Sequence, residues 1–253
     1  MGNPTWLDFN MLQTGRNSTH ESINLVKKSL DGESLYENLV YGPYDETNNK
    51  WKDNIKRTPF QVREDAYSEL FIGAFGNTYG HQAIYAFTDV EIVPDQNKSC
   101  YKNKKPQICT PSMPWEEALD APGATQMQHV TALMQSRPIQ RRVPAQSLLL
   151  APKDDIYDWT YAKKSLKVGF IVATKGDGYI MVYSSKGRKF TLNIPEAWEE
   201  INAWWYNPRT GENSSIAVTK ESSIDFTPLK KDEDWVLVVD DTKRNFPAPG
   251  SAD

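Results

Sequence analysis

Two kinds of hydrophobic pattern divide the chain. In residues 1–140, short apolar runs alternate with segments whose apolar residues recur every three or four positions, as in amphipathic helices. From Val143 onward, short apolar stretches separated by turn-forming residues dominate, and helix signals nearly vanish. The change falls between Arg137 and Arg142. We therefore expect two domains, residues 1–140 and residues 141–253.

The first domain is predicted to alternate strands with helices, which is typical of a parallel α/β fold. The clearest helix signal has Thr58 as N-cap, Pro59 at the first helical position and Gln61 completing a capping box. Residues 41–57 and 89–112 are predicted as long loops. The expected strands are Trp6–Met11, Ser29–Leu35 and His81–Phe87. The other expected helices follow Asn17, follow Pro114, and carry Met127, Val130, Leu133 and Met134 before Pro138.

The second domain is predicted to be an antiparallel β-sandwich, because short strands recur with turn signals between them. The consecutive residues Trp204, Trp205 and Tyr206 cannot share one face of a strand, so at least one of them is expected in the core. The segment Asn207–Gly211 is predicted as a β-turn. The expected strands are Ser147–Leu150, Val168–Thr174, Tyr179–Tyr183, Lys189–Leu192, Ile201–Tyr206, Ser223–Phe226 and Trp235–Asp240.

The candidate chemistry lies in the second expected strand. Alternation along a strand places Asp31 and Glu33 on one face. A carboxylate at a strand end, with glycine beside it and Tyr36 within reach, fits a nucleophile in a sugar-cleaving pocket. The same residues also fit a solvated acidic turn, and Asp31 fits a structural, hydrogen-bonded carboxylate. The stretch alone leaves these alternatives open.

Composition narrows the class of protein. The net charge of −4 gives no reason to expect nucleic acid or an anionic membrane as partner, and no apolar run has the length of a transmembrane helix. We find no metal-ligand spacing and no phosphate-binding glycine loop, so no cofactor is expected. A disulfide between Cys100 and Cys109 and the sequons at Asn17, Asn97 and Asn213 favour an extracellular protein, although the first residues lack the features of a signal peptide.

Several ordered motifs resemble a known family. The segments Trp6–Met11, Asp31–Glu33, Gly73–His81 and Trp115–Met127 are similar to the second half of the apiosidase-like glycoside hydrolase catalytic domain. The segments Trp204–Gly211 and Asp234–Leu237 resemble the collagen-binding-like β-sandwich that usually follows this catalytic domain. The resemblance extends over nearly the whole chain, with departures at Ser34 and Asn77, where the family has proline and histidine.

The resemblance implies a (β/α)8 (TIM-type) barrel of which this chain holds about strands 6–8, with the site at the C-terminal strand ends. It places the nucleophile of a retaining O-glycosidase at Glu33 and the acid/base on a strand that this chain lacks. The substrate is expected to be a plant cell-wall type glycan. The expected substrate-binding residues are Asp8, Asn10, Tyr36, His81 and Tyr85, although Tyr85 and Phe87 also fit core positions.

The resemblance and the short barrel together predict a protein that is weakly active or inactive alone. Three strands with unpaired edges also favour self-association. Two alternatives stay open: a non-catalytic carbohydrate-binding or interaction protein made of a remnant barrel and a sandwich, and a fragment of a longer chain.

Overall fold

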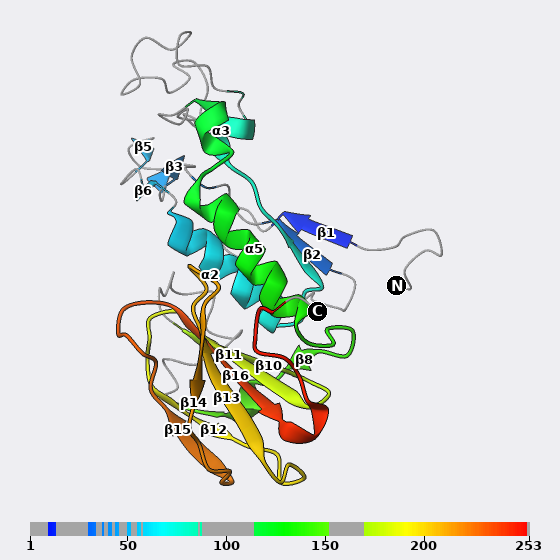
Figure 1. Cartoon of the computed structure of the whole chain (residues 1–253). Coiled ribbons are helices and arrows are strands. Elements are labelled where there is room, and N and C mark those ends of the chain that lie inside the picture. Colours follow the sequence, from blue (N-terminus) through cyan, green and yellow to red (C-terminus); the bar gives the residue numbers. More distant parts are fainter. Residues whose placement is uncertain are drawn as a thin grey trace, which may run out of the picture.

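A computed structural model describes the fold in residues 10–13, 30–33, 37, 40–41, 44–45, 50–51, 55–56, 58–85, 87, 114–151 and 170–251. Before residue 58, only Glu37 is described beyond the course of its backbone. Figure 1 shows helices α2 and α5 lying between a small sheet, formed by the first part of the chain, and the larger sheets of the second part. None of the described helices is both long and apolar enough to cross a membrane.

The first part of the chain builds a three-stranded parallel sheet in the order β1, β2, β7. Strand β1 is Asn10–Gln13, β2 is Leu30–Glu33 and β7 is Gly76–Thr78. Both neighbouring pairs run parallel, and helix α2, Pro59–Phe71, lies between β2 and β7 along the chain. Parallel strands need a long crossover connection, which this helix supplies. The expected alternation of strand and helix is thus seen around β2, α2 and β7.

The strand expected at His81–Phe87 is wrong. The third strand lies earlier, at Gly76–Thr78, and residues Gln82–Tyr85 form the short helix α3. Tyr85 and Phe87 are exposed at 68% and 73% of their surface, so they are not core residues either. Helix α2 ends at Phe71, before the glycine-rich residues 73–80, and within this segment Gly76 and Asn77 are held in the sheet by the backbone pairing with β2.

The segment expected as a long loop at residues 41–57 contains regular pairing. Strand β3, Val40–Tyr41, pairs antiparallel with β6, Ile55–Lys56, and β4, Tyr44–Asp45, pairs with β5, Lys50–Trp51. The two pairs are nested, as in a hairpin. Because each strand is only two residues long, no alternation of apolar and polar residues was long enough to indicate it.

Helix α2 forms as the sequence predicts. The Thr58 hydroxyl accepts a hydrogen bond from the Gln61 N–H (3.3 Å), and the Gln61 side chain accepts one from the Thr58 N–H (2.9 Å), which completes the capping box. Helix α4 spans Trp115–Ala118, and α5 spans Pro122–Gln135 with proline at its start. One core holds the apolar residues of α2 and α5: Ala66, Tyr67, Leu70, Phe71, Val130, Leu133 and Met134. Val62 is also buried, and Met127 packs against that core.

The second part of the chain consists mainly of two antiparallel sheets. The larger one has the strand order β14, β13, β16, β11, β10, β8, and the smaller one β15, β12, β9. The strands of both sheets and the two short 3-10 helices are β8 Val143–Pro144, η3 Gln146–Leu148, β9 Leu149–Leu150, β10 Ile171–Gly176, β11 Tyr179–Ser184, β12 Phe190–Asn193, β13 Ile201–Tyr206, β14 Asn213–Ile216, β15 Ser223–Phe226, β16 Trp235–Asp241 and η4 Thr242–Arg244.

Most of these strands were predicted to within a few residues, and two were missed. Strand β14 is polar and largely exposed, and β8 contains Pro144 at the edge of the sheet, where proline is tolerated. Neither has the alternation by which strands are recognised. The expected strand Ser147–Leu150 is only partly correct, because its first two residues belong to η3.

The central strands of the larger sheet are buried on both faces. Along β11, Tyr179, Met181 and Tyr183 pack against α2 and α5, while Ile180 and Val182 point into the core between the two sheets. The residues of β16 also alternate between the core under the helices and the core between the two sheets. Figure 1 shows the helices lying across this sheet. Trp205 and Tyr206 are both buried, on opposite faces, as three consecutive aromatic residues require. Strands buried on both faces have nearly continuous apolar sequences.

Buried ion pairs join the helices to this sheet. Arg63 of α2 donates two hydrogen bonds to Asp234, both 2.9 Å long, and Arg209 donates a third of 2.8 Å. Burial alone would lower the pKa of Arg63, but its hydrogen bond and charge interaction with Asp234 outweigh it and raise that pKa. Arg137, just after α5, makes a second bidentate pair with Asp240, at 2.9 and 2.6 Å. Both pairs fix the helix layer on the sheet.

Candidate active-site edge

The carboxyl ends of the three parallel strands meet at one edge of the small sheet. The backbone register aligns Gln13 with Glu33 and Glu33 with Thr78, so Glu33 is the last residue of the central strand β2. We call this row of Gln13, Glu33 and Thr78 the C-terminal edge. In parallel α/β folds, functional side chains gather at this edge of the sheet. The predicted nucleophile is therefore positioned where such folds carry their chemistry.

The chain continues its pairing beyond this edge. Glu37 forms an isolated parallel bridge with His81. The Glu37 N–H donates to the Gly80 carbonyl, and the Gln82 N–H donates to the Glu37 carbonyl, both at 2.9 Å. These bonds tie the segment after β2 to the segment after β7. They fix the distance between these two segments just beyond the C-terminal edge.

The carboxylate of Glu37 is buried and supported from two sides. It is 3% exposed, and the Tyr79 hydroxyl donates a 2.6 Å hydrogen bond to its Oε2 atom. On the other side it lies against Gly123, where a Cβ atom would come within 2.0 Å of Oε2. Gly123 is in the first turn of α5, whose partial positive charge stabilises a carboxylate. Burial first, and then the bond to Glu37, raise the pKa of the Tyr79 hydroxyl well above its ordinary value. Glu37 thus holds the edge rather than facing solvent.

His81 lies next to the edge but is buried. Its Nδ1 atom accepts a 3.0 Å hydrogen bond from the Ala83 N–H, which leaves the Nε2 atom to carry the proton of the neutral ring. Through this hydrogen bond, His81 stabilises the turn that leads into α3. Direct contact with a sugar requires an opening that the described residues do not show at this side chain.

Of the remaining candidate residues, the structure describes Asn10 and Tyr85, and neither lies in the row that forms the C-terminal edge. Asn10 begins β1, three residues before the C-terminal edge, and Tyr85 is exposed on α3. The exposed Phe87 ring meets Trp115 of α4 edge-on at 6.2 Å. Asp8, Tyr36 and the Cys100–Cys109 pair lie outside the described residues.

Sequence reasoning missed the supporting contacts of this edge. The pairing of Glu37 with Tyr79 and Gly123 joins positions that lie far apart along the chain. The only sequence signal of these contacts was Gly123, which directly follows Pro122 at a helix start, where a side chain would normally be tolerated. Within the described residues, no group of three or more histidine, cysteine, aspartate or glutamate side chains is arranged to hold a metal ion.

Comparisons with known proteins agree with this architecture. Residues 1–141 match the family model described as "Apiosidase-like, catalytic domain", and residues 143–240 match that of the "Putative collagen-binding domain of a collagenase". No curated protein matches the chain.

Two solved structures are similar over 95% of the chain. One, named a glycoside hydrolase, is 25% identical with a TM-score of 0.73, and the other, a glycoside hydrolase family 5 protein from Bacteroides vulgatus, is 24% identical with a TM-score of 0.73. The chain spans 54% and 52% of the length of these two proteins. The family match covers more than half of the sequence, and the chain therefore belongs to the apiosidase-like glycoside hydrolase family.

Proposed function

We propose that this chain carries the nucleophile half of a retaining O-glycosidase that acts on plant-type glycans. The supporting observation is the position of Glu33 at the end of the central strand of a parallel sheet, in a chain of the apiosidase-like family. In a retaining mechanism, one carboxylate attacks the anomeric carbon and a second carboxyl group, about 5 Å away, protonates the leaving oxygen. Glu33 takes the first role.

The same proposal treats β1, β2 and β7 as about strands 6–8 of a (β/α)8 barrel, within a domain of residues 1–140 that precedes a sandwich of residues 141–253. The chain spans about half of the two similar structures. We assign the acid/base to a barrel strand that does not belong to residues 1–253. The isolated chain is then weakly active or inactive with substrates whose leaving group needs protonation.

Supporting roles follow from the contacts. Glu37, Tyr79 and His81 join the chain beyond β2 to the chain beyond β7, and the exposed Tyr85 is a sugar-contacting residue. Within the described residues, β1 and β7 each pair on one side only, so the sheet edge is available for self-association or for a partner strand. Because the proposed substrate is a plant-type glycan, we propose an extracellular location for the protein.

An assay with two kinds of substrate tests the function. The purified chain and a Glu33→Gln variant are compared on apiose-containing pectic fragments and on aryl glycosides. We expect slow turnover of aryl glycosides only, abolished in the variant. Rapid turnover of the pectic fragments that is lost in the variant would show that another residue of this chain serves as acid. Sugar binding without turnover, equal in both proteins, would favour a carbohydrate-binding module.

A further inference from the structure

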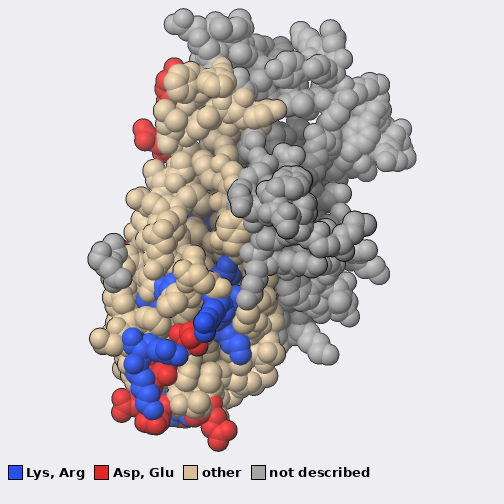
Figure 2. All heavy atoms as spheres, turned by 90° about the vertical axis from the view of Figure 1, so that its right-hand side faces the viewer, with Lys and Arg blue, Asp and Glu red and all other residues tan. Residues whose placement is uncertain are grey.

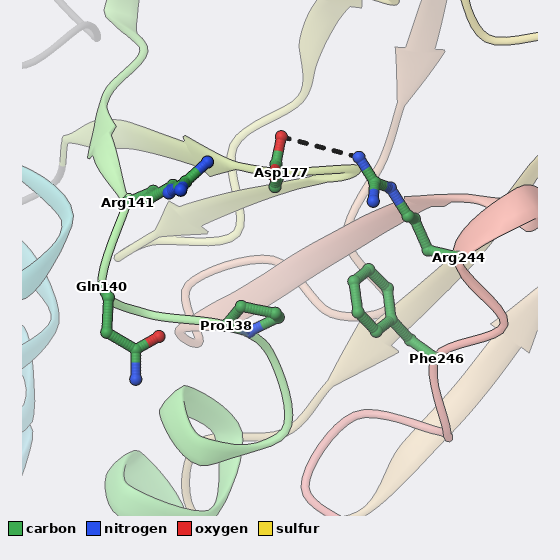
Figure 3. Close-up of a pocket in the computed structure, with 6 residues that line it drawn as sticks. All are labelled: Pro138, Gln140, Arg141, Asp177, Arg244 and Phe246. Atoms are coloured by element: carbon green, nitrogen blue, oxygen red, sulfur yellow. Dashed lines mark ion pairs between the residues drawn. The ribbon is translucent and has the colours of Figure 1, made fainter.

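A cavity lies at the junction of the two parts of the chain, away from the C-terminal edge. It has a volume of about 310 Å³, at the lower end of the range for small-molecule sites. Three segments form it: the link after α5, the turn between β10 and β11, and the residues after β16 (Figure 3). Its lining residues are Pro138, Gln140, Arg141, Asp177, Arg244 and Phe246. We call it the junction cavity.

Arg244 is held in place on one wall of this cavity. Its side chain lies over Gly178, where a Cβ atom would meet the Arg244 Cγ atom at 2.3 Å. Gly178 has φ +81°, a conformation that favours glycine, so the turn leaves room for the arginine. Asp177 makes a 3.5 Å ion pair with the Arg244 guanidinium, drawn as a dashed line in Figure 3. Asp177 and Gly178 thus position Arg244 and leave several of its donors for a ligand.

The apolar wall is equally well supported. The Phe246 ring rests over the Arg137 guanidinium, with 4.9 Å from the Cζ atom to the ring centre, and meets Tyr179 edge-on at 6.3 Å. Arg137 is itself fixed by its buried pair with Asp240. The Tyr179 hydroxyl donates a 3.0 Å hydrogen bond to the Pro138 carbonyl. These contacts hold Phe246 and Pro138 in place, so an apolar surface is present before a ligand binds.

Arg141 supplies a second cation. Its side chain makes no hydrogen bond or ion pair with any other residue in the described part of the chain. The lining thus has two guanidinium groups against one carboxylate. Figure 2, which looks at the side of the molecule where η4 lies in Figure 1, shows lysine and arginine side chains gathered over the lower part of this face, with aspartate and glutamate side chains among and below them.

We propose that the junction cavity binds a carboxylate-bearing sugar, a uronic acid residue of a glycan. The planar guanidinium fork of Arg141 or Arg244 matches a carboxylate. Phe246 and Pro138 offer an apolar surface to the C–H face of the sugar ring. Gln140 and the remaining donors suit its hydroxyl groups. None of these residues belongs to the C-terminal edge, so the proposal does not depend on the role of Glu33.

Isothermal titration of the 253-residue chain with digalacturonate tests this proposal. We expect millimolar or tighter binding, weakened about tenfold in Arg141→Gln, since a charge-assisted hydrogen bond contributes about 1.5 kcal/mol or more. Among the described residues Arg141 has no partner to lose, so this variant should melt at the wild-type temperature. Lys231→Gln removes the same charge from an exposed position outside the cavity and should bind as the wild type does.

Titrations with neutral galactobiose and with inorganic phosphate distinguish recognition of the sugar ring from recognition of the negative charge. Both should bind at least about tenfold more weakly than digalacturonate. Equal binding of galactobiose would show a neutral-sugar site, and equal binding of phosphate would show an unspecific anion site; either result overturns the proposal. Absence of digalacturonate binding at millimolar concentration, or binding that Arg141→Gln leaves unchanged, also overturns it.

Discussion

At Gly123, the absence of a side chain allows the Glu37 carboxylate to reach the first turn of α5. This contact connects Glu37, which follows the predicted nucleophile strand, to a helix that packs on the second part of the chain. Neither residue was identifiable as a partner of the other from the sequence, because they are far apart and no periodicity links them. The local sequence left the role of Glu33 open, and the family resemblance assigned it the nucleophile role, but the contacts that support its edge required the three-dimensional structure.

We predict that Gly123→Ala lowers the free energy of unfolding by about 1–3 kcal/mol, the usual cost of overpacking. The added methyl group would come within 2.0 Å of the Glu37 Oε2 atom, so the carboxylate must move away from Tyr79. Urea denaturation measures the change. Gln128→Ala, at an exposed position of the same helix, should stay within about 0.5 kcal/mol of the wild type. Equal stability of both variants would contradict the contact.

His129 predicts a pH dependence of stability. Burial lowers its pKa below the ordinary 6.5, and its ring lies against the backbone of Gly211. As the pH falls through 6.5, the unfolded chain takes up a proton before the folded one does. The free energy of unfolding should therefore decrease until the lowered pKa of the folded state is reached. Chemical denaturation between about pH 7.5 and about pH 5.5 measures this slope, which His129→Gln should reduce. An unchanged slope in the variant would refute the assignment.

At the scale of elements, strong local signals predicted the structure well and weak ones did not. Helix α2 has a capping box, proline and apolar periodicity together, and β11 and β16 have long apolar runs. Strand β7 has only Gly76–Thr78, whose composition is typical of a turn. It is a strand because β2 offers a backbone partner, and such long-range pairing overrides local propensity. Helix α3 was mistaken for a strand because four residues cannot distinguish the two periodicities.

The capping box of α2 should contribute measurably to the stability of the folded protein. Thr58→Ala removes the hydroxyl that accepts the Gln61 N–H and should destabilise the protein by about 1 kcal/mol. Thr58→Ser keeps this acceptor and should be close to the wild type. Thermal unfolding followed by circular dichroism compares the two variants. A serine variant as unstable as the alanine variant would mean that the methyl group, rather than the cap, stabilises the helix.

At the scale of the whole molecule, the two family regions share a core. The larger sheet presents Tyr183, Tyr206 and Val236 to α2 and α5, and the Arg63–Asp234 pair crosses the same boundary. The change of pattern near residue 140 predicted a second region rich in strands, but it gave no sign that one sheet face would be covered by helices from the first region. That arrangement depends on contacts between residues more than a hundred positions apart.

We predict that Asp234→Asn destabilises the protein by about 3–5 kcal/mol, since it leaves the buried Arg63 without its counter-charge. The neighbouring Glu233 provides a matched control, because it also pairs with Arg209 but is partly exposed. Glu233→Gln should have a much smaller effect that diminishes with added salt. Urea denaturation at two salt concentrations measures both. Similar losses in the two variants would show that the buried pair has no special role.

The most direct test of the glycosidase proposal is covalent trapping at Glu33. A dinitrophenyl apioside has a leaving group that departs without protonation, so a nucleophile alone suffices to form the glycosyl-enzyme. After incubation of the 253-residue chain, mass spectrometry of the peptide that contains Leu30–Glu33 should find the sugar on Glu33. The adduct should be retained in Asp31→Asn and absent in Glu33→Gln. Turnover of the apioside with the adduct on another residue, or with no change in Glu33→Gln, would contradict the proposed role of Glu33.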